Sequence, residues 1–248
     1  MVLGQPSGPG APSAAPGEAR PRDGVLGVDA CRAGWVGAFL GPEGRGSVTV
    51  VVAPTVALLL QLGGAADVVG VDIPIGLPDG GRREADVRTR RFLGRAKSSS
   101  VFTTPTRAAL QEADYAAANA RNRERAGMGL SRQAHALRRS ILEVDAWLRA
   151  GPACRVLEVH PEASFAMMTG ATLTTRKRTP EGRQERRAAL AGVGIHVAPT
   201  PPRGAAPDDV LDACAAAWSA HRVRVGSALS FPDEPEVFSD GIPAAIHV

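Results

Sequence analysis

The sequence predicts an α/β fold built around a mixed sheet, and three features of the chain support this prediction. Two apolar runs, residues 25–29 and 68–72, are rich in β-branched residues, and each ends in the tripeptide Gly-Val-Asp. Runs of this kind are typical of strands buried on both faces of a sheet. Three strand-like segments with short connections come first, which predicts an antiparallel meander. A helix-like segment then leads to the second run, and such a crossover makes the flanking strands parallel.

Each element rests on its own local signal. Thr55 is placed as an N-cap, Pro74 stops the preceding strand because proline donates no ladder hydrogen bond, and Ser131 is placed to cap a long helix through Trp147. Between 81 and about 148 the composition is mostly helical. The other expected elements are strands at 24–29, 34–40, 47–52, 68–72 and 154–160, and helices at 55–62, 162–168, 180–190 and 208–222.

Length and composition favour one soluble domain. The chain has 248 residues, 44% of them hydrophobic, and no run approaches the roughly 20 apolar residues of a membrane span. We expect a single domain at 24–248 with a helical insertion at about 81–150. Residues 1–23 are rich in Gly, Pro, Ala and Ser and lack the apolar centre of a signal peptide, so we expect a disordered tail. Three widely separated cysteines form no zinc or disulfide pattern, which suits a reducing cytoplasm.

The net charge of +4 is unevenly distributed along the chain. Basic residues concentrate in segments 82–107, 121–139 and 176–187, a pattern that suits a polyanionic partner such as nucleic acid. An alanine- and arginine-rich composition with solvated helix faces explains the same pattern without a partner. For phosphate contacts the candidates are Arg82, Arg95, Lys97 and Arg107.

Carboxylates at the ends of the two Gly-Val-Asp strands are the main candidate site. Neighbouring strands lie ~4.8 Å apart, so parallel pairing would bring Asp29 beside Asp72, and two such charges need a cation or a proton between them. The competing explanation is that each aspartate caps its following loop. On the last helix, Asp209 and Asp212 are spaced i,i+3 and can face one side together, although acids at a helix start also complement its dipole.

Other motifs add two candidate residues and argue against several classes of protein. Glu158 and His160 share one face of a strand end, where they either join the site or simply meet solvent. Ser99 lacks a Gly-x-Ser-x-Gly context, which argues against a serine hydrolase. Neither a phosphate-binding P-loop motif nor a dinucleotide-binding glycine motif follows a strand.

Five motifs in order make the chain similar to the DUF429 family. They are GVDACRAGW (27–35), VDIPIGLP (71–78), FLGRAKSSSVFTTPTR (92–107), LEVHPEASF (157–165) and DDVLDACAAAW (208–218). Members of that family are described as predicted nucleases with a ribonuclease H-like fold. The resemblance implies a mixed five-stranded sheet, an antiparallel meander followed by parallel strands, flanked by helices. It also implies catalytic acids on the first strand, the fourth strand and the last helix, which correspond here to Asp29, Asp72, Asp209 and Asp212, with Glu158 as an extra acid.

The expected function is that of a divalent-metal-dependent nuclease that hydrolyses phosphodiester bonds in DNA or RNA. Asp29 would ligate both of two Mg²⁺ or Mn²⁺ ions, Asp72 and Asp212 would each hold one, and Asp209 would complete the shell. One alternative is a non-catalytic module of the same fold that binds metal or nucleic acid. Another is an actin-like nucleotide phosphotransferase, which the bulky turn at 30–34 disfavours because phosphate loops prefer glycine and threonine.

Overall fold

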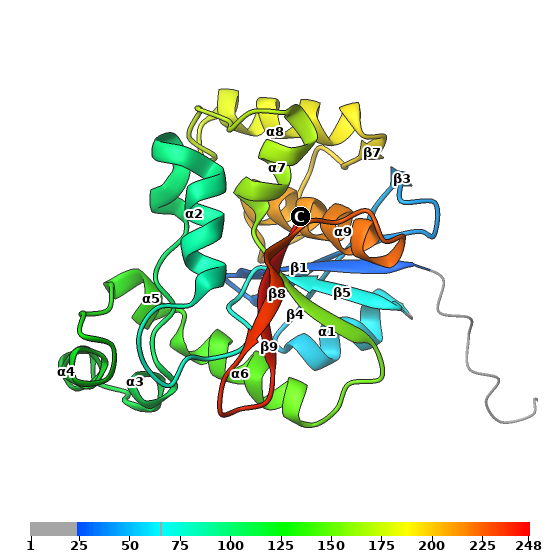
Figure 1. The fold of residues 1–248 in the computed structure, drawn as a ribbon. Coiled ribbons are helices and arrows are strands. Elements are labelled where there is room, and N and C mark those ends of the chain that lie inside the picture. The colour runs from blue at the N-terminus through cyan, green and yellow to red at the C-terminus, as the bar shows by residue number, and fades with distance from the viewer. Residues whose placement is uncertain (1–23, 65) are drawn as a thin grey trace, which may run out of the picture.

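A seven-stranded mixed sheet runs through the centre of the structure, a computed structural model that describes residues 24–64 and 66–248 (Figure 1). Across the sheet the strands are β4 (Thr49–Ala53), β2 (Gly34–Leu40), β1 (Val25–Cys31), β5 (Val68–Val71), β6 (Arg155–Val159), β9 (Pro243–His247) and β8 (Ser230–Val237). The first three pair antiparallel, whereas β1, β5, β6 and β9 pair in parallel. The expected meander followed by parallel strands is therefore found. The tail expected at 1–23 lies outside the described residues.

Two strands of the large sheet were not expected, so the prediction of five strands is wrong. The extra hairpin consists of β9 and β8, which pair antiparallel and extend the sheet beyond β6. Pro232 and Pro235 lie inside β8, and Pro243 is the first residue of β9. Proline argues against a central strand but is tolerated on an edge strand or at a strand start, which is where these prolines lie.

Two further boundaries differ from the sequence prediction. The strand expected at 47–52 is divided, because β3 (Gly46–Ser47) leaves the meander and pairs in parallel with β7 (Ile195–His196). The long helix expected from Ser131 is also divided, into α5 (Arg132–Ala136) and α6 (Arg138–Arg149). Ser131 does cap α5, by accepting a 3.0 Å hydrogen bond from the amide of Ala134.

Helices cover both faces of the large sheet (Figure 1). On one face lie α7 (Pro161–Thr169), α8 (Pro180–Gly192) and α9 (Pro207–Arg224), and on the other lie α1 (Val56–Gly63) and α6. Between β5 and β6 the chain forms α2 (Glu84–Lys97), a short 3-10 helix (Ser98–Ser100), α3 (Arg107–Gln111), α4 (Tyr115–Ala126), α5 and α6, where the helical insertion was expected. No helix in the described ranges is long and apolar enough to cross a membrane.

Helix α9 packs so closely on the sheet that its backbone contacts the backbone of β1 and β5, and the glycines of the repeated tripeptide make this possible. A Cβ atom at Gly27 would lie 2.0 Å from the carbonyl oxygen of Ala213, and one at Gly70 would lie 2.8 Å from that of Ala216. Any larger residue at Gly27 would push α9 away from β1. The first turns of α9 thereby lie over the carboxyl ends of β1 and β5.

Candidate functional site

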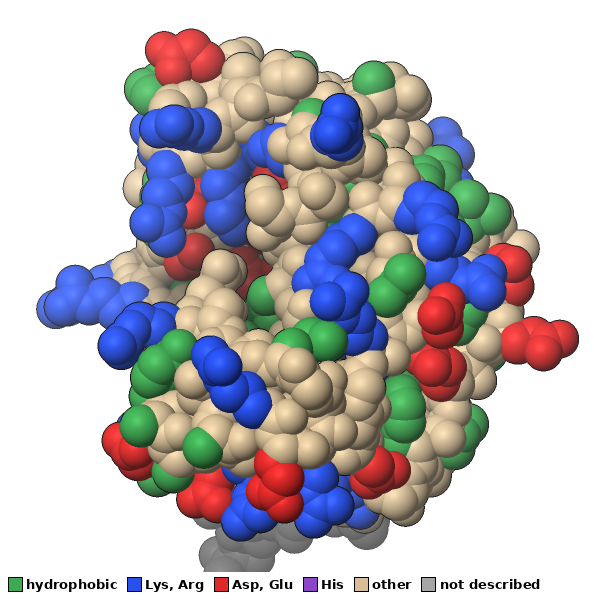
Figure 2. Space-filling model, turned by 60° about the vertical axis from the view of Figure 1, so that its left-hand side comes forward, with side chains coloured by type: hydrophobic (Ala, Val, Ile, Leu, Met, Phe, Trp, Pro, Cys, Tyr) green, Lys and Arg blue, Asp and Glu red, His purple; other side chains and the backbone are tan. Residues whose placement is uncertain are grey.

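A cavity of about 780 Å³ opens at the carboxyl ends of β1, β5 and β6, where the start of α9 meets the loop between α7 and α8. Figure 2 shows acidic side chains at the bottom of a hollow whose rim carries Lys and Arg side chains. The acidic and basic residues that line the cavity are Asp29, Asp72, Arg83, Asp86, Lys97, Glu158, Glu162, Arg176, Lys177, Arg178, Asp208, Asp209 and Asp212.

Strand register brings Asp29 and Asp72 together at the floor of this cavity. Val28 is paired with Val71 in parallel, and the amide of Asp72 donates a 2.9 Å hydrogen bond to the carbonyl of Val28. Burial and the nearby carboxylates of Asp72 and Asp212 raise the pKa of Asp29 well above its usual value. Its Oδ1 also accepts a 2.8 Å bond from the amide of Ala30. The two carboxyl groups therefore compete for the same counter-charge.

Asp212 joins this pair from α9, and it is only 1% exposed. Its Oδ2 accepts a 2.5 Å hydrogen bond from the ammonium group of Lys177. Its other oxygen, Oδ1, is buried and has no hydrogen-bond partner among the residues that the structure describes. Burial raises the pKa of Asp212 to about 6, although Lys177 acts in the opposite direction. A buried carboxylate oxygen without a partner is costly, so this oxygen is available for a ligand.

Asp209 and Asp208 lie at the same end of α9 but have local partners. Asp209 accepts a 2.9 Å bond from the amide of Ala206 and so caps the helix. Asp208 is paired with Arg178 at 3.5 Å. Burial raises the pKa of Asp209, and its charge adds to those that act on Asp29. Asp209 thus lies near the cluster, but its carboxylate is used to cap the N-terminus of α9.

Glu158 lies in a separate buried network. Arg83, which is fully buried, donates to both of its carboxylate oxygens at 2.8 and 2.9 Å, and the amide of Ile75 donates to it at 2.7 Å. The same guanidinium binds Asp86 at 2.6 Å. Burial raises the pKa of Glu158, against the effect of Arg83. Both oxygens of Glu158 are therefore occupied by hydrogen bonds, and these bonds attach the loop after β5 to strand β6.

A family model described as "Protein of unknown function (DUF429)" matches residues 27–237 of the chain. The chain belongs to the DUF429 family. This confirms the family resemblance that the five motifs indicated, and the matched range includes every candidate acid of the site. The DUF429 description names no activity. Neither the curated proteins nor the solved structures include a match to this chain.

The basic side chains of this DUF429 protein are placed differently from the expectation. Lys97 lines the cavity, where it pairs with Glu162 at 3.5 Å, whereas Arg82 and Arg95 are exposed outside the described cavity lining. Arg107 is bound to Asp145 at 2.9 Å and to Asp240 at 2.7 Å, so its guanidinium holds the fold together instead of facing the cavity.

Three consecutive cations that were not singled out from the sequence do line the cavity, namely Arg176, Lys177 and Arg178. The sequence signal for them was only their membership of the basic segment 176–187. Of the three, Lys177 interacts most closely with the aspartates of the cluster. Burial lowers its pKa, but the carboxylates of Asp212, Asp72 and Asp29 outweigh that effect and raise it overall.

The cluster suits a hard cation in its chemistry, since Mg²⁺ and Mn²⁺ prefer carboxylate oxygens. The unpartnered Oδ1 of Asp212 and the repulsion among the three aspartates fit such an ion. In the part of the chain that the structure describes, however, no group of three or more His, Cys, Asp or Glu side chains is arranged to hold a metal ion. Lys177 supplies the positive charge there instead.

Proposed function

We propose that this protein is a divalent-metal-dependent phosphodiesterase that acts on nucleic acid. The observation that supports this most directly is the cluster of Asp29, Asp72 and Asp212 inside a cavity with a basic rim, where one buried carboxylate oxygen has no hydrogen-bond partner among residues 24–64 and 66–248. Buried carboxylates that raise each other's pKa are typical of catalytic sites. Mg²⁺ or Mn²⁺ is the cofactor that the donor set would hold.

The order of the strands supports a ribonuclease H-like arrangement within the larger sheet. β4, β2, β1, β5 and β6 form a block in which an antiparallel meander is followed by parallel strands. The acids come from β1, from the end of β5 and from α9, which are the positions that the family resemblance implies. The β9–β8 hairpin lies outside this block.

The residues of the cavity divide between holding the ion and holding the substrate. Asp29, Asp72 and Asp212 would hold the divalent ion, which when bound supplies Lewis-acid stabilisation and a more acidic water molecule. Arg176 and Arg178 at the rim would attract the phosphates of the substrate backbone. The proposed partner is therefore a DNA or RNA strand whose backbone enters the cavity.

The substitution Asp29→Asn tests this function. With Mg²⁺ or Mn²⁺ present, we expect cleavage of a panel of single-stranded, duplex and branched DNA and RNA to fall by at least ~100-fold. Loss of a residue that only orients a metal ligand typically lowers metal affinity or activity by ~10–100-fold, and loss of the ligand itself should lower activity further. Asp233→Asn on the exposed face of β8 is the matched control and should retain activity. A wild-type protein that cleaves none of these substrates with either metal would contradict the proposal.

A non-catalytic module is the second candidate, and the contact of Lys177 with Asp212 favours it. An internal ammonium group reduces the need for a metal ion in the folded state. Calorimetry with Mn²⁺ and with oligonucleotides separates the two, because binding without turnover fits the module and turnover excludes it.

A further inference from the structure

Apolar side chains line part of the cavity that contains the aspartates. Phe102 follows the short 3-10 helix, Leu137 lies between α5 and α6, and Pro74 follows β5. All three belong to the connection from β5 to β6, whereas the basic side chains of Arg176 and Arg178 come from the loop between α7 and α8. The cavity therefore has an apolar part and a basic part, which different segments of the chain supply.

The backbone on both sides of Phe102 is held by hydrogen bonds. The guanidinium group of Arg90 donates to the carbonyl of Val101 at 2.9 Å and to the hydroxyl of Thr103 at 2.8 Å. The ring of Phe102 is half-buried and packs against apolar side chains of the helical insertion. An aromatic ring that is fixed in this way and also lines a cavity is a preformed surface on which another flat ring can stack.

The size of the cavity limits how a nucleic acid can reach the aspartates. A sphere of 780 Å³ is about 11 Å across. Asp29 and Asp212 are only 8% and 1% exposed, and the acidic side chains lie at the bottom of the hollow (Figure 2). The two grooves of a B-form duplex are about 8.5 and 7.5 Å deep, so a duplex is at least ~16 Å across and too wide to enter. Pockets of roughly 300–1,000 Å³ instead bind small molecules, a size class that includes one nucleotide.

We propose that the cavity takes one unpaired nucleotide of a single strand, with its base stacked on Phe102 and its phosphate near Arg176 and Arg178. Proteins that bind single strands combine aromatic side chains with a basic groove, and every base offers a flat face to stack. Nucleic acid as the partner rests on the proposed function, which is narrowed here from nucleic acid in general to single strands and unpaired ends. Neither the fixed ring nor the size of the cavity depends on a metal ion.

Fluorescence anisotropy of the full chain in EDTA, at one fixed salt concentration, tests this preference. The probes are end-labelled single strands of thymidine DNA and of uridine RNA, about 16 nucleotides long to cover the usual range of site sizes, and the blunt duplex of the DNA strand with its complement. We expect at least one of the two single strands to bind 10-fold or more tightly than the duplex. The tighter of the two identifies the substrate as DNA or RNA.

Phe102→Leu removes the ring but keeps an apolar side chain. It should weaken binding of the single strand by about 5- to 150-fold, the loss expected for one stacked base, and leave duplex binding unchanged. Phe102→Tyr keeps the ring and should bind as the wild type does. Phe92→Leu is the matched control, because Phe92 is 36% exposed and lies outside the cavity lining, and it should also bind normally.

A duplex that binds the wild type as tightly as both single strands would overturn the inference, and so would a wild type that binds neither. Unchanged single-strand binding by Phe102→Leu would also overturn it. If Phe102→Leu does not fold, the wild-type comparison and Phe102→Tyr still decide. A nuclease assay with Mg²⁺ or Mn²⁺ separates the inference from the proposed function. Single-strand binding without cleavage would refute only the function, whereas cleavage with equal binding of duplex and single strand would refute only the inference.

Discussion

Asp72 holds a carboxyl group where the folded protein disfavours its negative charge. Burial raises its pKa to about 6, and Lys177 only partly opposes this. In the unfolded chain the pKa of aspartate is about 3.9. The folded state thus binds the proton more tightly than the unfolded state does. Without metal, the stability associated with Asp72 is present below about pH 4 and is lost as the pH rises from about 4 to about 6.

Asp72→Asn should therefore stabilise the metal-free protein at pH 8. A shift of about two pKa units corresponds to about 3 kcal/mol, and partial exposure of Asp72 reduces the expected gain in unfolding free energy to roughly 1–2 kcal/mol. Urea unfolding in EDTA measures it, and the difference from wild type should vanish near pH 4.

Asp79→Asn is the control with the opposite sign. Hydrogen bonds from Ser239 lower the pKa of this exposed carboxyl group, so its replacement should give no gain at pH 8. If Asp72→Asn were no more stable than wild type at pH 8, the folded state would not disfavour the negative charge of Asp72 as described.

At the level of residues, the sequence predicted the positions of the acidic side chains in the fold better than those of the basic side chains. The ends of two strands and a helix periodicity placed Asp29, Asp72 and Asp212, because such local patterns determine where a side chain points. Lys177 belongs to a loop without periodicity, and its partner is 35 positions away. Arg107 was expected at phosphates, but its partners Asp145 and Asp240 are 38 and 133 positions away. Pairings of that range depend on the finished fold.

At the level of elements, the contact between β1 and α9 determines whether the site forms. The carbonyl of Ala213 and the amide of Ala217 occupy the space where a side chain at Gly27 would begin, each 2.0 Å from its Cβ position. Neither atom belongs to a flexible side chain, so the helix as a whole must move if that space is filled.

Gly27→Ala should consequently destabilise the protein by about 3 kcal/mol or more, because overpacking of a rigid contact costs typically 1–3 kcal/mol and occasionally more. Thermal and urea unfolding measure the loss. Gly192→Ala at the end of α8 is the control, since nothing lies within 4 Å of its Cβ position, and it should be nearly neutral. Equal stability of the two variants would show that α9 does not lie against β1 as described.

The sequence predicted the elements whose signals are local. Thr55 caps α1 as expected, by accepting a 3.3 Å bond from the amide of Leu58. By contrast, β8 and β9 were missed because their prolines contradict strand propensity, and pairing with β6 outweighs that propensity. The repeated Gly-Val-Asp predicted two adjacent strands, yet the reason for its glycines became visible only with α9 in place.

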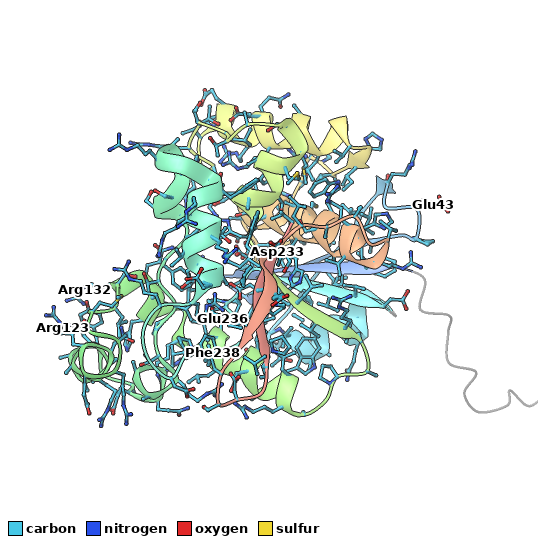
Figure 3. All side chains as sticks on the ribbon, in the orientation of Figure 1. Glu43, Arg123, Arg132, Asp233, Glu236 and Phe238 are labelled. Carbon is cyan, nitrogen blue, oxygen red and sulfur yellow. The ribbon has the colours of Figure 1, made fainter. Side chains whose placement is uncertain are left out.

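At the level of the whole molecule, basic side chains are spread over several surfaces. Arg123 and Arg132, on α4 and α5, project from the side of the molecule formed by the helical insertion (Figure 3). Arg176 lines the cavity. If nucleic acid enters the cavity, Arg176 contributes to phosphate binding, whereas Arg123 and Arg132 do not.

Arg176→Met should therefore make oligonucleotide binding less dependent on salt. Each phosphate contact contributes about 0.7 to 0.9 to the slope of log affinity against log salt concentration, so we expect the slope to fall by about that amount. Fluorescence anisotropy in EDTA, which prevents cleavage, measures it. Arg123→Met should leave the slope unchanged, and a larger effect of Arg123→Met would place the nucleic acid on the helical insertion instead.

The backbone contact at Gly27 and Gly70 has a consequence for how this protein can change. Main-chain atoms, whose dimensions are the same in every sequence, set the spacing between the strand that carries Asp29 and the helix that carries Asp212. Leucine, valine and isoleucine elsewhere in the interior can then be exchanged, in evolution or in a laboratory library, without altering that spacing. Divergent sequences that keep small residues along this one contact should retain superimposable aspartates even where little else in their interiors is shared.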